Sequence, residues 1–300
     1  MKQSIKFISL CAIIFLFIIL YPESLLIGTK NGLSLWYQQI LPALFPICFL
    51  QAIVMASGVL DNIPGKLLPR MLFPVGLVFG MPMGAKLAVD AYQNGYLTRK
   101  QCKALCIATG NFSISFFLNY VFRIIPLDIP HQVLFLCCIY GIPASYGFFM
   151  LFCYLQSPDP VQKNTAPRFR FDTKIFDAGI YDSFHILLKI CGYLIFASVL
   201  VVFLQKIPGK WILTKGILCG LTEATNGINL LGILPYPQFL KPVIAIIFLS
   251  FTGLSGVIQV CSLFSKTDLS PISYLSSKII VAIVTAICYQ VLALFVSPLW

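Results

Sequence analysis

Charged side chains are scarce in this chain of 300 residues: only 10% are Asp, Glu, Lys or Arg. An ordinary soluble domain carries about a quarter charged residues, so a large soluble domain is excluded. Catalytic signatures are missing too, since the sequence contains no HExxH, no GxSxG and no GxxxxGK[ST]. We therefore expect no enzyme, no cofactor and no resident metal. The 11 cysteines include no CxxC pair and read as small buried apolar side chains.

Apolar residues dominate the composition. They make up 59% of the chain, and the mean hydropathy is +0.91. A bilayer core needs roughly 20 apolar residues per helical span, which predicts an all-α, polytopic membrane protein. The uninterrupted spans are expected at 5–21, 33–57, 104–123, 132–155, 184–205 and 274–297. Three further segments are apolar but carry Gly, Pro or an ionisable residue: 67–91, 211–234 and 240–264.

The pattern divides the chain into four parts: an N-terminal membrane anchor (1–32), a first repeat (33–155), a polar cytoplasmic linker (156–183) and a second repeat (184–300). The two halves resemble each other weakly, "GAKLAVDAYQNGYLTRKQC" from Gly84 aligning with "GVIQVCSLFSKTDLSPISY" from Gly256. Transporters are often built from such inverted repeats. Thr98 and Ser270 are placed to cap the spans that follow them. The net charge of +11 serves orientation and contact with anionic lipid rather than nucleic acid.

The stretch "FGMPMGAKLAVDAY", residues 79–92, breaks an apolar segment with Gly80, Pro82 and Gly84. A broken helix at membrane depth must line a cavity or lie inside the protein, because free backbone N–H and C=O groups cannot face lipid. The half-helix that starts near Gly84 and Ala85 would present N–H groups and a positive dipole end, and Lys86 would add charge. The stretch therefore predicts the tip of a re-entrant hairpin with a site for an anion.

A structural interpretation of the same stretch remains open. Gly80, Gly84 and Ala88 could form a small-residue packing face, with Lys86 and Asp90 as an i, i+4 ion pair. A second break at "GLSG", from Gly253 to Gly256, weakens this alternative because packing needs no matching partner in the other half. We expect residues 80–86 and 253–259 to be two hairpin tips that face each other, with Ser255 and Gln259 adding neutral hydrogen bonds.

A third polar cluster, "LTEATNGINLLG" at 221–232, places Glu223 in apolar surroundings. An ionisable residue at membrane depth is a functional candidate by default. Glu223 could bind a coupling cation or carry a proton, and Asn226 could donate to substrate. The alternative is a loop outside the membrane with a turn at Asn226-Gly227. Asn111, in "TGNFSIS", is a further candidate, although such residues more often bond between helices.

These motifs, in this order, resemble the nucleoside-recognition or Gate class of bacterial membrane proteins, and within it the sporulation integral membrane proteins of the YlbJ type. The resemblance covers about residues 33–290. The family's motif Gly-Tyr-Pro-x-Gly-Ala-Lys maps onto Gly80, Pro82, Gly84, Ala85 and Lys86. Its motif Glu-x-Thr-Asn-Gly maps onto Glu223, Thr225, Asn226 and Gly227. Its motif Gly-Leu-Ser-x-x-x-Gln maps onto Gly253, Leu254, Ser255 and Gln259. The chain departs from the family at Phe79 and Met81, and it lacks the proline that usually follows Asn111.

The resemblance implies a relation to concentrative nucleoside transporters, with two inverted halves around a midplane site. It also implies alternating-access transport of a small anionic or nucleoside-like solute, dipicolinate in endospore formation being the specific candidate. The implied location is the cell membrane, and in a sporulating bacterium the outer forespore membrane. Expected partners are the solute, membrane lipid, a coupling cation or proton, and further copies of the chain. The alternative from another class is a non-transporting scaffold or regulator of the sporulation envelope.

Overall fold

The computed structural model describes residues 19–65, 67–154, 172–206 and 211–296, together with residues 8, 9, 12 and 16. Within these residues every regular element is a helix and no strand occurs. Five helical stretches are long and apolar enough to cross a membrane: Pro22–Ala56, Ile129–Met150, Thr173–Leu204, Leu240–Lys266 and Pro271–Ala293. The predicted all-α, polytopic membrane fold is thus confirmed, whereas the inverted relation between the halves stays a prediction.

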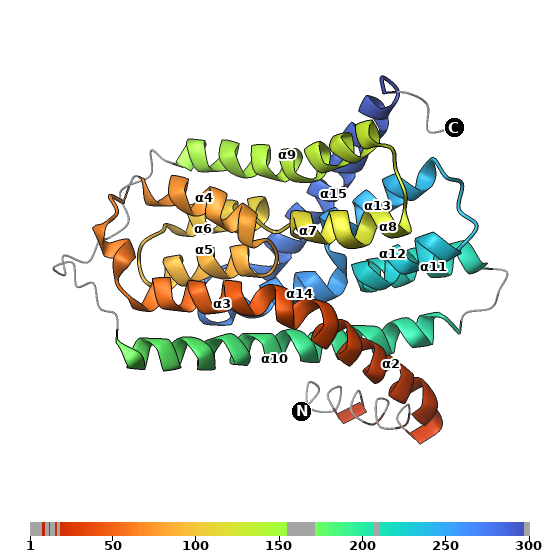
Figure 1. The fold of residues 1–300 in the computed structure, drawn as a ribbon, viewed down its shortest axis with the longest axis horizontal. Coiled ribbons are helices and arrows are strands. Elements are labelled where there is room, and N and C mark those ends of the chain that lie inside the picture. Colours follow the sequence, from red (N-terminus) through yellow and green to blue (C-terminus); the bar gives the residue numbers. More distant parts are fainter. Residues whose placement is uncertain are drawn as a thin grey trace.

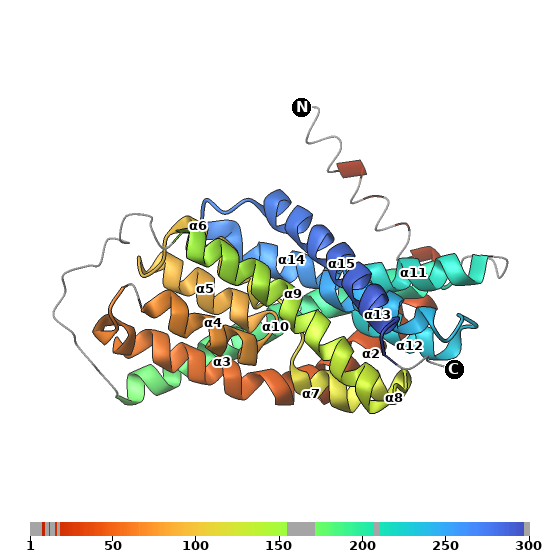
Figure 2. The same ribbon diagram turned by 90° about the horizontal axis from the view of Figure 1, so that it is seen from above.

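The elements form an elongated bundle, with α4, α5 and α6 near one end and α8, α11, α12 and α13 near the other (Figures 1 and 2). In chain order they are α2 (Pro22–Leu35), η1 (Trp36–Ile40), α3 (Leu41–Ala56), η2 (Val59–Asn62), α4 (Leu68–Phe79), α5 (Met83–Gln93), α6 (Arg99–Ala108), α7 (Ile114–Phe116), η3 (Phe117–Val121), α8 (Phe122–Ile124), α9 (Ile129–Tyr154), α10 (Thr173–Leu204), α11 (Ile212–Thr222), α12 (Ala224–Ile233), α13 (Leu240–Phe251), α14 (Gly253–Leu263), η5 (Phe264–Lys266) and α15 (Pro271–Ala293).

The long helix α10 lies along α2 and α3 (Figure 1). Gly28 and Gly32 let the backbones of α2 and α10 approach closely, since a Cβ on either would lie 2.6 Å from a Cα of α10. The expected boundary between anchor and first repeat, after residue 32, falls inside α2. More than half of the expected anchor span 5–21 lies outside the described residues, and so do residues 156–171 of the expected linker. The rest of that linker, from Thr173, is already helical.

The two groups of helices each contain one helical hairpin. Helices α4 and α5 run in opposite directions and are joined by residues 80–82, which confirms the turn expected there (Figure 1). Gly80 sits at φ 66° and ψ −171°, a conformation open to glycine alone. Helices α11 and α12 form the second hairpin, with Glu223 as the single residue between them. The second hairpin is therefore at 212–233 and not at 253–259, where we expected it.

Two helices are broken at the same depth as these hairpin turns. Helix α6 ends at Ala108, and residues 109–113 lead into α7, so the expected continuous span at 104–123 is wrong. Helix α13 ends at Phe251, and α14 continues past Thr252 in the same general direction (Figures 1 and 2). The expected hairpin tip at 253–259 is thus the bend of a broken helix. Thr252, at φ 70°, ends α13 in the left-handed region and redirects the chain without reversing it.

Each hairpin turn packs against one broken helix. The N–H of Met81 donates to the carbonyl oxygen of Asn111 at 2.7 Å, which ties residues 80–82 to residues 109–113. A Cβ on Gly253 would lie 2.9 Å from the backbone nitrogen of Ala224, which places residues 252–253 against residues 222–224. We call these contacts the first turn pair (80–82 with 109–113) and the second turn pair (222–224 with 252–253).

Helix caps and polar contacts connect the loops that precede α6 and α15. Thr98 caps α6 through a reciprocal capping box with Gln101, and Ser270 caps α15 by accepting from the N–H of Ser273. Both caps were predicted from the sequence. Asp268 accepts from the hydroxyl of Tyr92 at 2.6 Å and pairs with Arg99 at 3.2 Å, so the two loops that carry these caps lie together.

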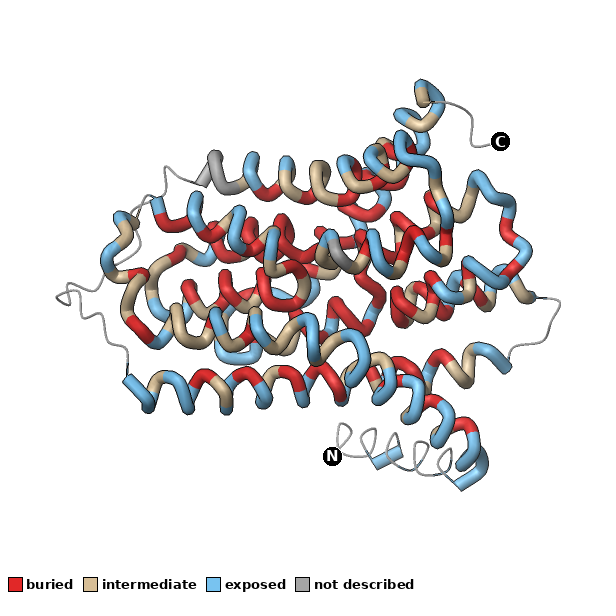
Figure 3. The backbone as a smooth tube through the Cα atoms, viewed as in Figure 1, coloured by how far each residue is buried: buried red, intermediate tan, exposed pale blue. Residues whose placement is uncertain are grey.

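Buried residues gather where the turn pairs meet, and exposed ones follow the outer helices (Figure 3). The exposed residues on α10 and α15 include many large apolar side chains, such as Leu188, Phe196 and Ile280, each at least 58% exposed. A soluble monomer rarely shows such apolar surface. The outer faces are therefore suited to lipid, and the polar breaks are enclosed by protein as membrane burial requires.

Candidate functional site

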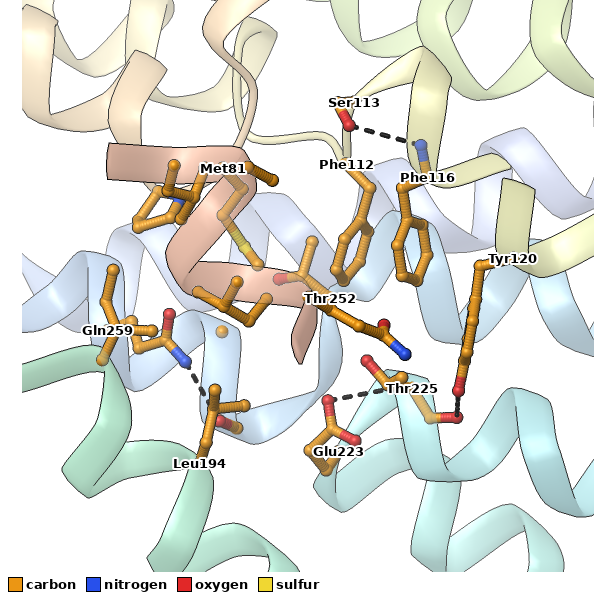
Figure 4. A pocket seen from close by; sticks show the side chains of 18 of the residues that line it. Met81, Phe112, Ser113, Phe116, Tyr120, Leu194, Glu223, Thr225, Thr252 and Gln259 are labelled. Carbon is orange, nitrogen blue, oxygen red and sulfur yellow. Dashed lines mark hydrogen bonds between the residues drawn. The ribbon is translucent and has the colours of Figure 1, made fainter. Parts of the chain in front are cut away.

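A cavity of about 570 Å³ lies between the two turn pairs (Figure 4). The hairpin α4–α5, the segment from 112 to 120, the turn before α12 and the break before α14 all contribute to its wall, and α3 and α10 close one side. The lining residues are Gln39, Ile40, Ala43, Leu44, Ile47, Phe79, Met81, Pro82, Phe112, Ser113, Phe116, Asn119, Tyr120, Ile190, Leu194, Glu223, Thr225, Thr252, Ser255, Gly256 and Gln259. Ligand pockets of about 300–1,000 Å³ are typical of small-molecule sites.

One wall of the cavity is a stack of three aromatic rings from the broken helix (Figure 4). The rings of Phe112 and Phe116 have centroids 4.7 Å apart, and those of Phe116 and Tyr120 are 5.0 Å apart. Phe116 in α7 and Tyr120 in η3 are four residues apart on a continuous helical stretch, and Phe112 joins the stack from the irregular segment that precedes α7. The hydroxyl of Tyr120 donates to the carbonyl oxygen of Thr225 at 3.2 Å, which ties this wall to α12. The sequence analysis singled out this segment for its polar residues and missed the aromatic wall.

Glu223 lines the cavity at the turn before α12, beside Thr225, and its carboxylate caps α12 (Figure 4). It accepts from the N–H of Thr225 at 3.1 Å, from the N–H of Asn226 at 2.7 Å and from the side-chain amide of Asn226 at 2.9 Å. The residue is 4% exposed. A carboxylate at a helix N-terminus satisfies free N–H groups and meets the positive end of the dipole. The α12 N-terminus thus already binds an anion that belongs to the chain, and Asn226 supports Glu223 without lining the cavity.

The expected tip at 80–86 is only partly turned toward the cavity. Met81 and Pro82 line it, and a Cβ on Gly256 would lie 2.9 Å from the Met81 sulfur, so the two predicted segments do meet. Gly84 instead faces α4, where a Cβ would lie 2.5 Å from the carbonyl oxygen of Gly76. The small-residue packing that we left open therefore describes Gly84.

Lys86 does not reach the central cavity. Its ammonium group pairs with Asp90 one turn along α5, and Asp90 also accepts from the amide of Gln51 at 3.2 Å. The expected i, i+4 pair is present, and Lys86 points to a second cavity of about 420 Å³. That cavity shares Pro82, Ile190 and Gln259 with the first, and its charged lining residues are Lys86, Asp90, Asp182, Lys189 and Lys266.

The predicted site residues fall into two groups. Pro82, Glu223, Ser255, Gly256 and Gln259 line the central cavity, where the amide of Gln259 donates to the hydroxyl of Ser255 at 3.2 Å. Gly80, Gly84, Ala85, Asn111, Asn226 and Gly253 do not line it and hold the turns that shape it. Whether any of them contacts a solute stays a prediction.

Lys278 is the charged residue that the sequence analysis missed. It lies in the first half of α15 with no exposed surface, and its ammonium group donates to the carbonyl oxygen of Gly110 at 2.8 Å, in the broken helix of the first turn pair. A lone lysine inside the apolar segment 274–297 was the available signal, because an ionisable residue at membrane depth is a functional candidate.

The fold and site define the class: a polytopic α-helical membrane protein whose hairpins and broken helices enclose a polar and aromatic cavity. The chain is similar to Sporulation integral membrane protein YlbJ of Bacillus subtilis (strain 168), with 24% identity over 340 residues that cover 94% of this chain and 79% of that protein. This similarity confirms the predicted resemblance to sporulation membrane proteins of the YlbJ type, while a Gate domain stays a prediction. No protein-family model matches the chain, and no solved structure matches it.

Proposed function

We propose that the chain moves a small planar solute across the membrane by alternating access. The observation that carries this proposal is the central cavity, which is enclosed by both turn pairs and is large enough for a small molecule. Broken helices with a binding site at the repeat interface are the usual design of secondary transporters. The proposal assigns no catalytic activity to the chain, and it places the protein in a cell membrane, with the outer forespore membrane as the specific candidate.

The cavity wall favours an aromatic solute with hydrogen-bonding edges. A planar ring can stack on the rings of Phe112, Phe116 and Tyr120, and base–aromatic stacking is worth about 1–3 kcal/mol. The rest of the lining offers amide and hydroxyl groups, including those of Thr225 and Gln259. Both candidates from the sequence, a nucleoside-like molecule and dipicolinate, have a planar aromatic ring.

The charges of the two cavities separate these candidates. Among the residues that line the central cavity, Glu223 is acidic and none is basic, so a neutral nucleoside-like ring fits that cavity better than a dianion. Dipicolinate would meet lysines only in the second cavity, at Lys86, Lys189 and Lys266. We therefore rank the nucleoside-like solute first for the central cavity. Dipicolinate stays a candidate because the α12 N-terminus offsets much of the Glu223 charge.

The second cavity supplies a route to the central one. The shared lining residues Pro82, Ile190 and Gln259 form the boundary between the two spaces. A solute would enter past the lysines of the second cavity and reach the aromatic wall when this boundary opens. Glu223, at the far wall, is our candidate for the proton or coupling-cation site, since it is the ionisable residue that faces the solute.

Uptake by purified protein in liposomes tests the proposal. Labelled uridine and labelled dipicolinate are offered separately, each with and without a pH gradient. We expect uptake of at least one solute, faster for uridine, and loss of gradient dependence in Glu223→Gln. Gly192→Ala is the control variant, because nothing lies within 4 Å of a Cβ at Gly192. If folded protein takes up neither solute, the transport proposal is wrong and the scaffold alternative gains.

A further inference from the structure

A buried lysine that the proposed transport function does not use contacts the end of α6. Lys278 has no exposed surface, and within the described part of the chain its ammonium group donates a hydrogen bond of 2.8 Å to the carbonyl oxygen of Gly110. The ion pairs of the described residues are Lys86–Asp90, Arg99–Asp268 and His131–Asp128, so no carboxylate there neutralises Lys278. A buried charge is costly unless something compensates it.

The surroundings of Gly110 provide that compensation. Helix α6 ends at Ala108, and the carbonyl groups of its last turn carry the negative end of the helix dipole. A Cβ on Gly110 would lie 3.1 Å from the hydroxyl oxygen of Tyr274 and 3.5 Å from the Lys278 nitrogen, so these groups converge on one point. The hydroxyl of Tyr274 and the amide oxygen of Asn111 are both buried, and neither has a hydrogen-bond partner among the described residues. Oxygen atoms and a helix C-terminus at an unwound segment are what a monovalent cation binds in membrane transporters.

We propose that the end of α6 is a monovalent-cation site that the chain fills with its own ammonium group. Lys278 is a positioning residue there: by holding Gly110, it fixes residues 109–113 in their bent path. Phe112 and Ser113 follow directly and line the central cavity. This role is independent of which solute the cavity accepts, and it holds even if the chain transports nothing.

Two substitutions separate charge from packing. Lys278→Ala removes the atoms of a propylammonium ion and leaves a space of that shape. Lys278→Met fills most of the space without a charge. Hydrogen–deuterium exchange of peptides from 105–113, measured by mass spectrometry on protein in lipid nanodiscs, reports how firmly the end of α6 is held. Lys174→Ala serves as the control, because Lys174 is exposed at the start of α10 and lines neither cavity.

We expect exchange in 105–113 to rise roughly tenfold in both Lys278 variants, as loss of a charged hydrogen bond implies. Added propylammonium should restore protection in Lys278→Ala but not in Lys278→Met, and 1-propanol should restore neither. Protection in Lys278→Met equal to that of the unmodified protein would overturn the proposal, and so would rescue of Lys278→Ala by 1-propanol.

A variant that does not fold still gives an answer. Lys278→Ala can be prepared with propylammonium present throughout, and the amine is then removed by dialysis. We expect the dialysed protein to lose protection at 105–113 or to unfold. Dialysed protein that keeps the exchange pattern of the unmodified chain would count against a cation site.

Discussion

The two turn pairs perform the same task with opposite charges. In the second turn pair, Glu223 caps α12 through backbone groups only two and three residues away. In the first turn pair, Lys278 reaches Gly110 from a helix 168 residues along the chain. An anion therefore meets the N-terminus of α12 in one turn pair, and a cation meets the C-terminus of α6 in the other, as helix dipoles favour.

This difference shows how a membrane protein can break its helices without leaving polar groups in lipid. In the second turn pair, the free backbone N–H groups are hydrogen-bonded locally, by the short motif "TEATN". In the first turn pair, the free carbonyl group is hydrogen-bonded by Lys278, which comes into reach only when α15 packs against α6. The second turn pair is therefore encoded in a stretch of sequence, whereas the first depends on the tertiary fold.

The largest effects are expected from the glycines that bring the hairpin arms together. A Cβ on Gly84 would lie 2.5 Å from the carbonyl oxygen of Gly76, and one on Gly227 would lie 2.3 Å from the Cα of Gly220. Because backbone atoms cannot move aside cheaply, Gly84→Ala and Gly227→Ala should each lower the free energy of unfolding by about 3 kcal/mol or more. Thermal unfolding in detergent measures this. Gly192→Ala should be neutral or slightly stabilising, and an equally stable Gly84→Ala would show that the first hairpin is loosely closed.

The N-terminal caps of α12 and α7 should contribute differently to the free energy of unfolding. Glu223→Ala removes a charged cap that accepts two backbone N–H groups, and we expect a loss of about 2 kcal/mol. Ser113→Ala removes a neutral cap, whose hydroxyl accepts from the N–H of Phe116 at 3.3 Å, and should lose about 0.5–1 kcal/mol. Glu223→Gln keeps an acceptor and should fall between them. Denaturant titration of the three variants checks the order, and equal losses for Glu223→Ala and Ser113→Ala would contradict the comparison.

The sequence predicted the local features of this molecule and missed those that need distant partners. Apolar runs predicted most of the membrane spans, and Thr98 and Ser270 predicted two caps, since each depends on neighbours a few residues away. Glu223 stood out because it interrupts an apolar stretch. The break at 109–113 was missed although Asn111 and Ser113 stood out there, because its tie to Lys278 is invisible along the chain.

The candidate site shows the same limit. Pro82, Glu223 and Gln259 were predicted and do line the central cavity, because a polar or helix-breaking residue in an apolar segment is a visible signal. Phe116 and Tyr120 were missed, because an aromatic residue in a membrane span gives no hint of whether it faces lipid or a cavity. The expected repeat alignment paired Gly84 with Gly256. In the structure Gly84 belongs to the hairpin α4–α5, whereas Gly256 belongs to the broken helix α13–α14, so the alignment paired two different kinds of element because both contain glycines.

Solute binding should distinguish the aromatic wall of the first half from the polar wall of the second. Phe116→Ala removes the central ring of the stack and should weaken binding of uridine roughly tenfold, as loss of one stacking partner implies. Gln259→Leu removes one hydrogen-bonding group and should weaken binding only about threefold. Equilibrium binding to the purified protein, followed by calorimetry, gives both values. If Gln259→Leu has the larger effect, hydrogen bonds rather than stacking hold the solute.

The smallest effect is expected at Thr252, where the second turn pair carries backbone strain. A residue with a Cβ in the left-handed region costs about 1 kcal/mol relative to glycine, and Thr252 adopts φ 70° and ψ 13°. Its hydroxyl donates to the carbonyl oxygen of Phe251 at 2.5 Å, which offsets part of that cost. Thr252→Gly should therefore raise the free energy of unfolding by less than about 1 kcal/mol, and Thr252→Ala, which keeps the strain and loses the hydroxyl, should lower it. The difference between these two variants in thermal unfolding isolates the strain. If Thr252→Gly is less stable than Thr252→Ala, the bend between α13 and α14 is held by the methyl-bearing side chain and not by the backbone.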